Sequence, residues 1–157
     1  MSSSDPIGEL QGRGVLAALS AAQLRQLLSH ARELQLNAGA TLFHQGDAAD
    51  RFYVLREGAV RVGVPAINGP ELEVQSLGPG DVIGWSWLIE PYSWTFEART
   101  TSDARLLSFD GKAIIAECNE DPAFGFALFK VFAGLMSTRL QSARTRMMQS
   151  WAPPGWA

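Results

Sequence analysis

Cysteine and histidine are scarce in this chain, and their scarcity excludes several kinds of chemistry. Among 157 residues there is a single cysteine, Cys118, so no disulfide framework can form. The two histidines, His30 and His44, stand on separate elements, whereas a metal ion needs several converging ligands. No serine lies in a nucleophile elbow, and no base of the usual kind neighbours Cys118. The sequence therefore predicts no catalytic residue, no metal site and no enzymatic activity.

Long apolar runs and an excess of positive charge are also lacking. No run approaches the roughly 18 consecutive apolar residues of a membrane span, and residues 1–6 have neither the charge nor the apolar core of a signal sequence. The net charge is −3, so we expect no basic surface for a nucleic-acid backbone. Together with the single thiol, these features predict a cytoplasmic protein that binds neither membranes nor nucleic acid.

The length and the 46% hydrophobic content suit one globular core. Residues 1–18 are small, polar and rich in glycine, so a flexible segment is expected there. A single domain is expected over residues 19–150. Residues 151–157 form a tail with two tryptophans and two prolines, and the sequence does not decide between a partner-binding and a disordered tail.

The first clear helix signal is a capping box. The Ser20 side chain can accept from the N–H of the third helical position, and Gln23 at that position can reach back to the cap. The apolar residues that follow at helical spacing predict a helix to about Ala31 with one buried face: Leu24, Leu27, Leu28 and Ala31.

From Leu34 to Asp110 the apolar period changes to two, and turn residues recur at short intervals. This pattern is typical of short antiparallel strands with one buried face. Strands are predicted at residues 41–43, 52–56, 59–64, 71–77, 95–101 and 104–109. Turns are predicted at Glu57–Gly58, at Asn68–Gly69 and at residues 78–81, where glycine tolerates a positive φ.

Two helices are predicted after the strands. Asp110 can cap a short helix through about Glu117, and Pro122 suits the first turn of a long helix through about Gln149. One apolar stripe of the long helix can cover the β core: Phe124, Leu128, Val131 and Leu135. A second stripe either widens that buried face or, as we favour, forms a two-fold homodimer through the helix. Its residues are Phe132, Met136, Leu140, Ala143 and Met147.

This order of elements resembles the cyclic nucleotide-binding domain family over residues 19–149. The residues that carry the resemblance are Gln45–Asp47, Phe52–Gly58, Leu77–Gly84 and Ala104–Asp110. The resemblance implies an α+β, mainly β fold, an antiparallel β-roll of the catabolite-activator kind. This double-stranded, jelly-roll-like β-helix has an N-terminal helix and a long C-terminal helix. It also implies a phosphate-binding cassette, which here spans residues 80–99.

The cassette lacks the two side chains that the resemblance implies. In family members that bind cyclic nucleotide, a glutamate after the cassette glycine accepts from the ribose, and an arginine about ten residues later holds the phosphate. Here Gly84 is followed by Trp85, whose indole can only donate. A gapless alignment puts Trp94 at the arginine position, and a one-residue shift puts Ser93 there. Losing two charged hydrogen bonds of roughly 1.5–3 kcal/mol each predicts that ordinary tight cAMP binding is lost.

Other groups in the cassette still suit a ligand. Free backbone N–H groups at the start of the cassette helix favour a small anion, and hydroxyl groups stand nearby. The tryptophans either offer faces to a planar ligand or, as we favour, fill the cavity where a ligand once sat. Arg99 either reaches an anion or, as we favour, pairs with an acid such as Glu97. The candidate ligand-binding residues are Gly84, Trp85, Ser86, Trp87, Ser93, Trp94, Thr95 and Arg99.

Two functions follow from these features. The first is a stand-alone regulatory or sensor module, whose ligand, a cyclic nucleotide or another small anionic planar molecule, changes the packing of the C-terminal helix. The alternative is a ligand-free scaffold that acts by dimerisation or by docking on a partner protein, with its pocket plugged by tryptophans. A transcription factor is the least favoured class, because residues 150–157 are too few for a helix-turn-helix module.

Overall fold

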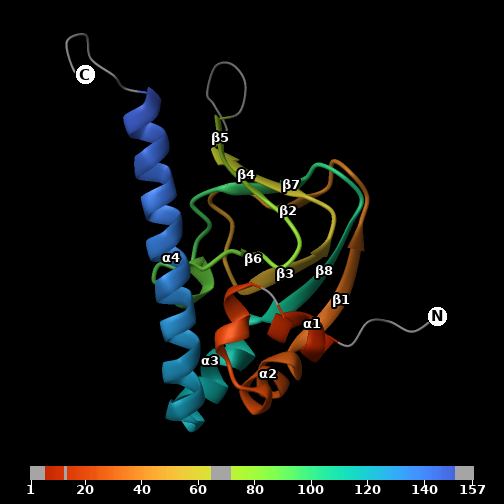
Figure 1. Cartoon of the computed structure of the whole chain (residues 1–157), viewed down its shortest axis with the longest axis vertical. Helices are drawn as coiled ribbons and strands as arrows, with labels where there is room; N and C mark the ends of the chain where they lie inside the picture. The colour runs from red at the N-terminus through yellow and green to blue at the C-terminus, as the bar shows by residue number, and fades with distance from the viewer. Residues whose placement is uncertain (1–5, 13, 65–71, 151–157) are drawn as a thin grey trace.

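The computed structural model describes residues 6–12, 14–64 and 72–150. Two four-stranded antiparallel sheets form a β-roll, with helices at one end and along one side (Figure 1). One sheet has the order β1 (Ala31–Leu36), β8 (Ala104–Asp110), β3 (Arg51–Glu57), β6 (Val82–Ile83). The other has the order β2 (Thr41–Phe43), β7 (Glu97–Thr100), β4 (Val60–Val64), β5 (Leu72–Leu77). The predicted mainly β roll is confirmed.

Strand β3 lies at the centre of the protein and is buried on both faces. Phe52 and Val54 belong to the core cluster beneath the helices, whereas Tyr53 and Leu55 belong to the cluster inside the roll. Successive side chains of a strand point to opposite faces, so β3 supplies both cores at once. Strands β6 and β8 divide their residues between the two clusters in the same way, so the helices and the roll are joined through shared strands.

The predicted capping box of α2 (Ala21–Leu28) is present. Ser20 accepts from the N–H of Gln23 at 3.1 Å, and the Gln23 side chain accepts from the N–H of Ser20 at 3.0 Å. The helix ends at Leu28, before the predicted Ala31, because Ala31 already pairs with Phe109 as the first residue of β1. This strand was missed by the sequence prediction, since it is mostly half-buried or exposed and shows little apolar alternation.

The expectation of a flexible segment is wrong for residues 6–12 and 14–18. These residues form α1 (Pro6–Gly12) and the 3₁₀ turn η1 (Val15–Ala18). Leu10 and Leu16 are buried, and Glu9 pairs with the buried Arg56 at 2.8 Å. The partners of this segment lie far away along the chain, so its local composition gave no sign of them.

The turns are as predicted where the structure describes them. Gly58 and Gly80 have φ values of +98° and +93°, which suit glycine. A Cβ at Gly58 would lie 2.4 Å from the carbonyl oxygen of Asp103, so the close approach also requires glycine. The predicted turn at Asn68–Gly69 and the tail at residues 151–157 lie outside the described residues.

Helices α3 (Gly111–Glu120) and α4 (Pro122–Ser150) begin where the sequence predicted. Asp110 caps α3 by accepting from the N–H of Ala113 at 3.2 Å. Figure 1 shows α4 running along one side of the roll. The first apolar stripe of α4 is buried, as predicted: Phe124, Leu128, Val131 and Leu135.

The second apolar stripe of α4 is divided between core and surface. Phe132 is buried and meets Phe52 and Trp87 edge-on, with centroid distances of 5.1 and 5.3 Å. Its assignment to an interface between copies is corrected: it is a core residue. Leu140 and Met147 are each 64% exposed. Met136 is half-buried against the core, so the exposed part of the stripe begins at Leu140.

Helix α4 is also long and apolar enough, by length and composition, to cross a membrane, with a mean hydropathy of 1.3. The sequence analysis sought an unbroken apolar run, and Lys130 interrupts the one in α4. Core helices pass the same test, and Phe124 and Leu128 pack in the core of the described protein. Packing in the core therefore explains the apolar character of the N-terminal part of α4, where Phe124 and Leu128 lie.

Candidate functional site

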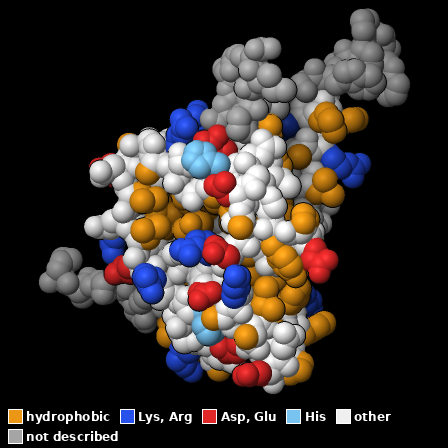
Figure 2. Space-filling view, turned by 180° about the vertical axis from the view of Figure 1, so that it is seen from behind, with side chains coloured by type: hydrophobic (Ala, Val, Ile, Leu, Met, Phe, Trp, Pro, Cys, Tyr) orange, Lys and Arg blue, Asp and Glu red, His pale blue; other side chains and the backbone are white. Residues whose placement is uncertain are grey.

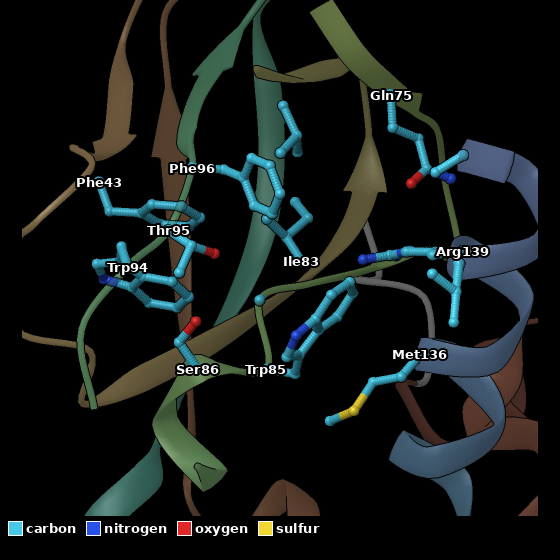
Figure 3. A pocket seen from close by; sticks show the side chains of 14 residues that line it. Phe43, Gln75, Ile83, Trp85, Ser86, Trp94, Thr95, Phe96, Met136 and Arg139 are labelled. Atoms are coloured by element: carbon cyan, nitrogen blue, oxygen red, sulfur yellow. The ribbon is translucent and has the colours of Figure 1, made fainter. Parts of the chain in front are cut away.

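A cavity of about 210 Å³ lies between the cassette, the roll and α4 (Figure 3). Its lining is mostly apolar. The roll contributes Phe43, Val62 and Gln75; the cassette Ile83, Gly84, Trp85, Ser86, Trp94, Thr95 and Phe96; and α4 Met136, Arg139, Leu140 and Ala143. Because a cavity of about 150 Å³ admits benzene, this one has room for a somewhat larger planar molecule.

Trp94 fills the part of the site next to the cassette glycine. Its ring stacks on Phe43 with a centroid distance of 3.8 Å, and only 5% of the residue is exposed. Ser93, the other candidate for the arginine position, forms a bridge with Ala48 and does not line the cavity. This favours Trp94 as the equivalent position. The indole then occupies the space beside Gly84 where the family resemblance leads us to expect the cyclic phosphate.

The other two cassette tryptophans differ from each other. Trp87 is 1% exposed, stacks on Phe52 at a centroid distance of 4.9 Å and does not line the cavity. Its prediction as a ligand-binding residue is corrected, because its ring belongs to the core. Trp85 is half-buried and lines the cavity. Trp87 and Trp94 are therefore packed as core residues, whereas the half-buried Trp85 offers its ring to a ligand in the cavity.

Arg139 is the charged residue of the cavity lining that the sequence analysis missed. Its guanidinium reaches from α4 into the cavity, lies 5.4 Å from the centroid of the Trp85 ring and donates to the backbone carbonyl of Val82 (Figure 3). Burial lowers the pKa of Arg139 to about 10, and the nearby Asp81 carboxylate partly opposes that shift. Arg139 thus stays charged at neutral pH. The one indication of this residue in the sequence is its positive charge next to Leu140, among the apolar residues of the second stripe of α4.

The remaining predicted residues divide between the cavity and its surroundings. Ser86 and Thr95 line the cavity, as does Gly84. Arg99 does not; its guanidinium lies 3.3 Å from a carboxylate oxygen of Glu97, which is the favoured alternative. The predicted cassette helix is a single 3₁₀ turn, η2 (Ser86–Leu88), so it presents few backbone donors for an anion.

Replacing Gly84 with alanine is expected to destabilise the protein by about 2–3 kcal/mol. Gly84 has a φ of +97°, and a Cβ there would lie 2.6 Å from the Trp94 ring. Gly134→Ala is the matched control, because Gly134 lies in α4 and the added Cβ would meet nothing within 4 Å beyond the adjacent residues and backbone of its own helix. That variant should be stabilised by about 0.5–1 kcal/mol. Urea denaturation measures both, and equal effects would contradict the tight contact between Gly84 and Trp94.

Residues 33–121, more than half of the chain and the whole cassette, match the family model described as "Cyclic nucleotide-binding domain". The chain belongs to this family. The "CRP-like cAMP-activated global transcriptional regulator" of Mycobacterium tuberculosis is 26% identical over 120 residues, which cover 76% of this chain and 54% of the relative. The "Cyclic AMP receptor protein" of Thermus thermophilus is 25% identical over 134 residues, 85% of this chain and 60% of the relative. The chain thus spans little more than half the length of these relatives.

Solved structures of the family have the same fold. The N-terminal domain of a transcriptional regulator from Streptomyces coelicolor has a TM-score of 0.69 and 28% identity, covering 85% of this chain and 94% of that one. The Thermus thermophilus Catabolite Activator Protein has a TM-score of 0.68 and 25% identity, covering 85% and 61%. The chain is therefore a cyclic nucleotide-binding-like domain similar to regulators of the catabolite-activator kind.

Proposed function

We propose that this chain is a non-enzymatic, cytoplasmic sensor module whose ligand is a small planar molecule rather than tightly bound cAMP. The observation that carries the proposal is the cavity of about 210 Å³ that stays open beside α4 although Trp94 fills the space at Gly84. A pocket fully plugged by tryptophans would leave no such space. The family's site is thus altered rather than abolished.

The cavity touches the element that would report its occupancy. Met136, Leu140 and Ala143 of α4 line it, and the last two are exposed on the helix surface. The binding free energy of a ligand that contacts these residues depends on the position of α4. Binding would therefore shift the helix between positions, which is the coupling that a sensor requires.

The exposed face of α4 fits a second copy of the chain. Its apolar residues are spaced alternately four and three apart, the repeat of a coiled-coil seam. They are Phe129, Ala133, Leu140, Ala143 and Met147, which are exposed, and Met136, which is half-buried. Hydrophobic side chains are visible along the side of the molecule that carries α4 (Figure 2). A two-fold dimer through this face would place each cavity beside the dimer seam.

Replacing Met147 with glutamate is expected to convert the dimer to monomers at tens of micromolar protein. The charge would be placed in the apolar seam, where the exposed Met147 lies. Thr145→Glu is the control, because Thr145 is exposed but lies outside the seam. Light scattering gives the mass of each species. A monomeric unmodified protein, or dissociation by both variants alike, would contradict the seam.

Ligand binding itself is tested by thermal shift and calorimetry with cyclic mono- and dinucleotides, nucleotide phosphates and smaller planar compounds. A compound that fits should stabilise the protein by about 2.7 kcal/mol at a concentration one hundred times its Kd. Thr95→Phe should abolish the effect, because Thr95 lines the cavity, whereas Thr101→Phe, at an exposed position off the lining, should not. No shift with any planar compound at millimolar concentration would refute the sensor.

The second candidate is a ligand-free scaffold that acts through dimerisation or by docking on a partner protein. The burial of Trp87 and Trp94 favours it, since both rings pack as ordinary core residues. The ligand-binding experiment distinguishes it from the sensor. A scaffold would have the same mass in light scattering as a sensor. No compound, however, would stabilise it through an effect that Thr95→Phe abolishes.

A further inference from the structure

We propose that Arg139 supplies from α4 the cation that the cassette lacks, and that the cavity takes a planar molecule carrying one anionic group, such as an aromatic carboxylate. The inference rests on the proposed function, because it requires the cavity to hold a ligand. It adds the chemical class of that ligand and the residue that recognises its charge.

Arg139 is the only charged residue in the described lining of the cavity. Among the described residues, no carboxylate forms an ion pair with it. The nearby Asp81 carboxylate accepts from the backbone N–H of Gly78 at 2.8 Å, so it is already engaged in the turn. The contacts of the guanidinium are the Val82 carbonyl and the face of Trp85. A guanidinium has five N–H donors, and the Val82 carbonyl is the one acceptor among these contacts. Most of the donors therefore have no partner in these two contacts.

A cation in an apolar cavity is costly to keep without a counter-charge. An anionic ligand removes that cost, and a carboxylate matches the planar guanidinium with two parallel hydrogen bonds. The half-buried Trp85 ring lies beneath the same guanidinium and offers a flat apolar face to the rest of the ligand. Charge recognition and ring stacking are therefore available within one small volume (Figure 3).

The position of the cation matters for signalling. With Trp94 against Gly84, the anion is displaced from the cassette toward α4. The group that binds the ligand's charge then lies on the helix whose position reports occupancy. Filling the cavity would draw Arg139, and with it α4, toward the ligand and away from the Val82 carbonyl.

The test compares 2-naphthoate with its neutral amide, 2-naphthamide, on the full chain by calorimetry. The unmodified protein should bind naphthoate more tightly than the amide. Arg139→Gln should weaken naphthoate by roughly 10–100-fold and leave the amide within about twofold. Arg139→Lys keeps the charge without the planar fork and should give an intermediate affinity for naphthoate. Thermal melts confirm that each variant is folded.

The outcomes separate this inference from the proposed function. If the amide binds the unmodified protein as tightly as naphthoate, or Arg139→Gln weakens both compounds equally, the role of Arg139 is overturned while the sensor stands. If neither compound binds and no planar compound stabilises the protein, both proposals are overturned. Selective loss of naphthoate in Arg139→Gln, with partial retention in Arg139→Lys, supports the inference.

Discussion

Replacing Trp94 with alanine is expected to lower the free energy of unfolding by about 3–5 kcal/mol. Trp94 is 5% exposed, stacks on Phe43 and presses against Gly84, so its removal deletes a large buried ring from the wall of the roll. The surrounding strands cannot collapse fully into the space, because a cavity already lies beside it. The loss is therefore expected at the upper end for core substitutions.

The matched control for this prediction is Trp85→Ala. Trp85 lies in the same cassette but is only half-buried, and it packs at the margin of the core while lining the cavity. We expect that variant to lose about 1 kcal/mol. Guanidinium denaturation followed by far-ultraviolet circular dichroism measures both. Should the two substitutions cost the same, Trp94 would not be the structural ring described above.

The double variant Trp85→Glu with Trp94→Arg is expected to raise the affinity for cAMP by about 10²–10⁴-fold. It restores the carboxylate after Gly84 and the guanidinium at the position that the gapless alignment assigns to the family's arginine. The glycine between β6 and η2 is retained with its φ of +97°, so the turn that presents these side chains is already formed. Removing the indole also clears the space beside Gly84.

Calorimetry with cAMP measures this gain. The control is Trp85→Gln with Trp94→Met, which removes both rings without adding charge and should leave the affinity for cAMP low. Circular dichroism establishes that both double variants fold. A folded Glu/Arg variant that binds cAMP no better than the neutral control would show that the retained cassette backbone is not a working scaffold for the cyclic phosphate.

Features that depend on neighbouring residues were predictable from the sequence. The capping serine of α2, the capping aspartate of α3 and the first-turn proline of α4 act within three or four positions, and each helix begins where they indicate. The strands with clear alternation or glycine turns were placed to within a few residues. The roll followed from their order together with the family resemblance.

Features held by distant contacts were not predictable in this way. Helix α1 is short and contains two glycines, and its place depends on Leu10 in the core and on Glu9 beside Arg56. Strand β1 pairs along its whole length with β8, which comes much later in the chain. Local periodicity carries no information about either partner, so propensity alone gave a flexible segment and a longer helix.

Only part of the candidate site could be predicted from the sequence. The missing cassette acid and arginine follow from the residues after Gly84, and the cassette does lie at a cavity. Which of the three tryptophans line that cavity depends on side-chain packing that the residue type does not fix: Trp85 and Trp94 do, and Trp87 does not. Arg139 comes from α4, and only the folded arrangement brings it over Trp85.

The most direct test is an experimental structure of the unmodified protein crystallised with millimolar cAMP. We expect Trp94 to remain stacked on Phe43 and no cyclic phosphate to be bound beside Gly84. Electron density for cAMP at full occupancy, with its phosphate against Gly84 and the Trp94 ring turned away, would contradict it.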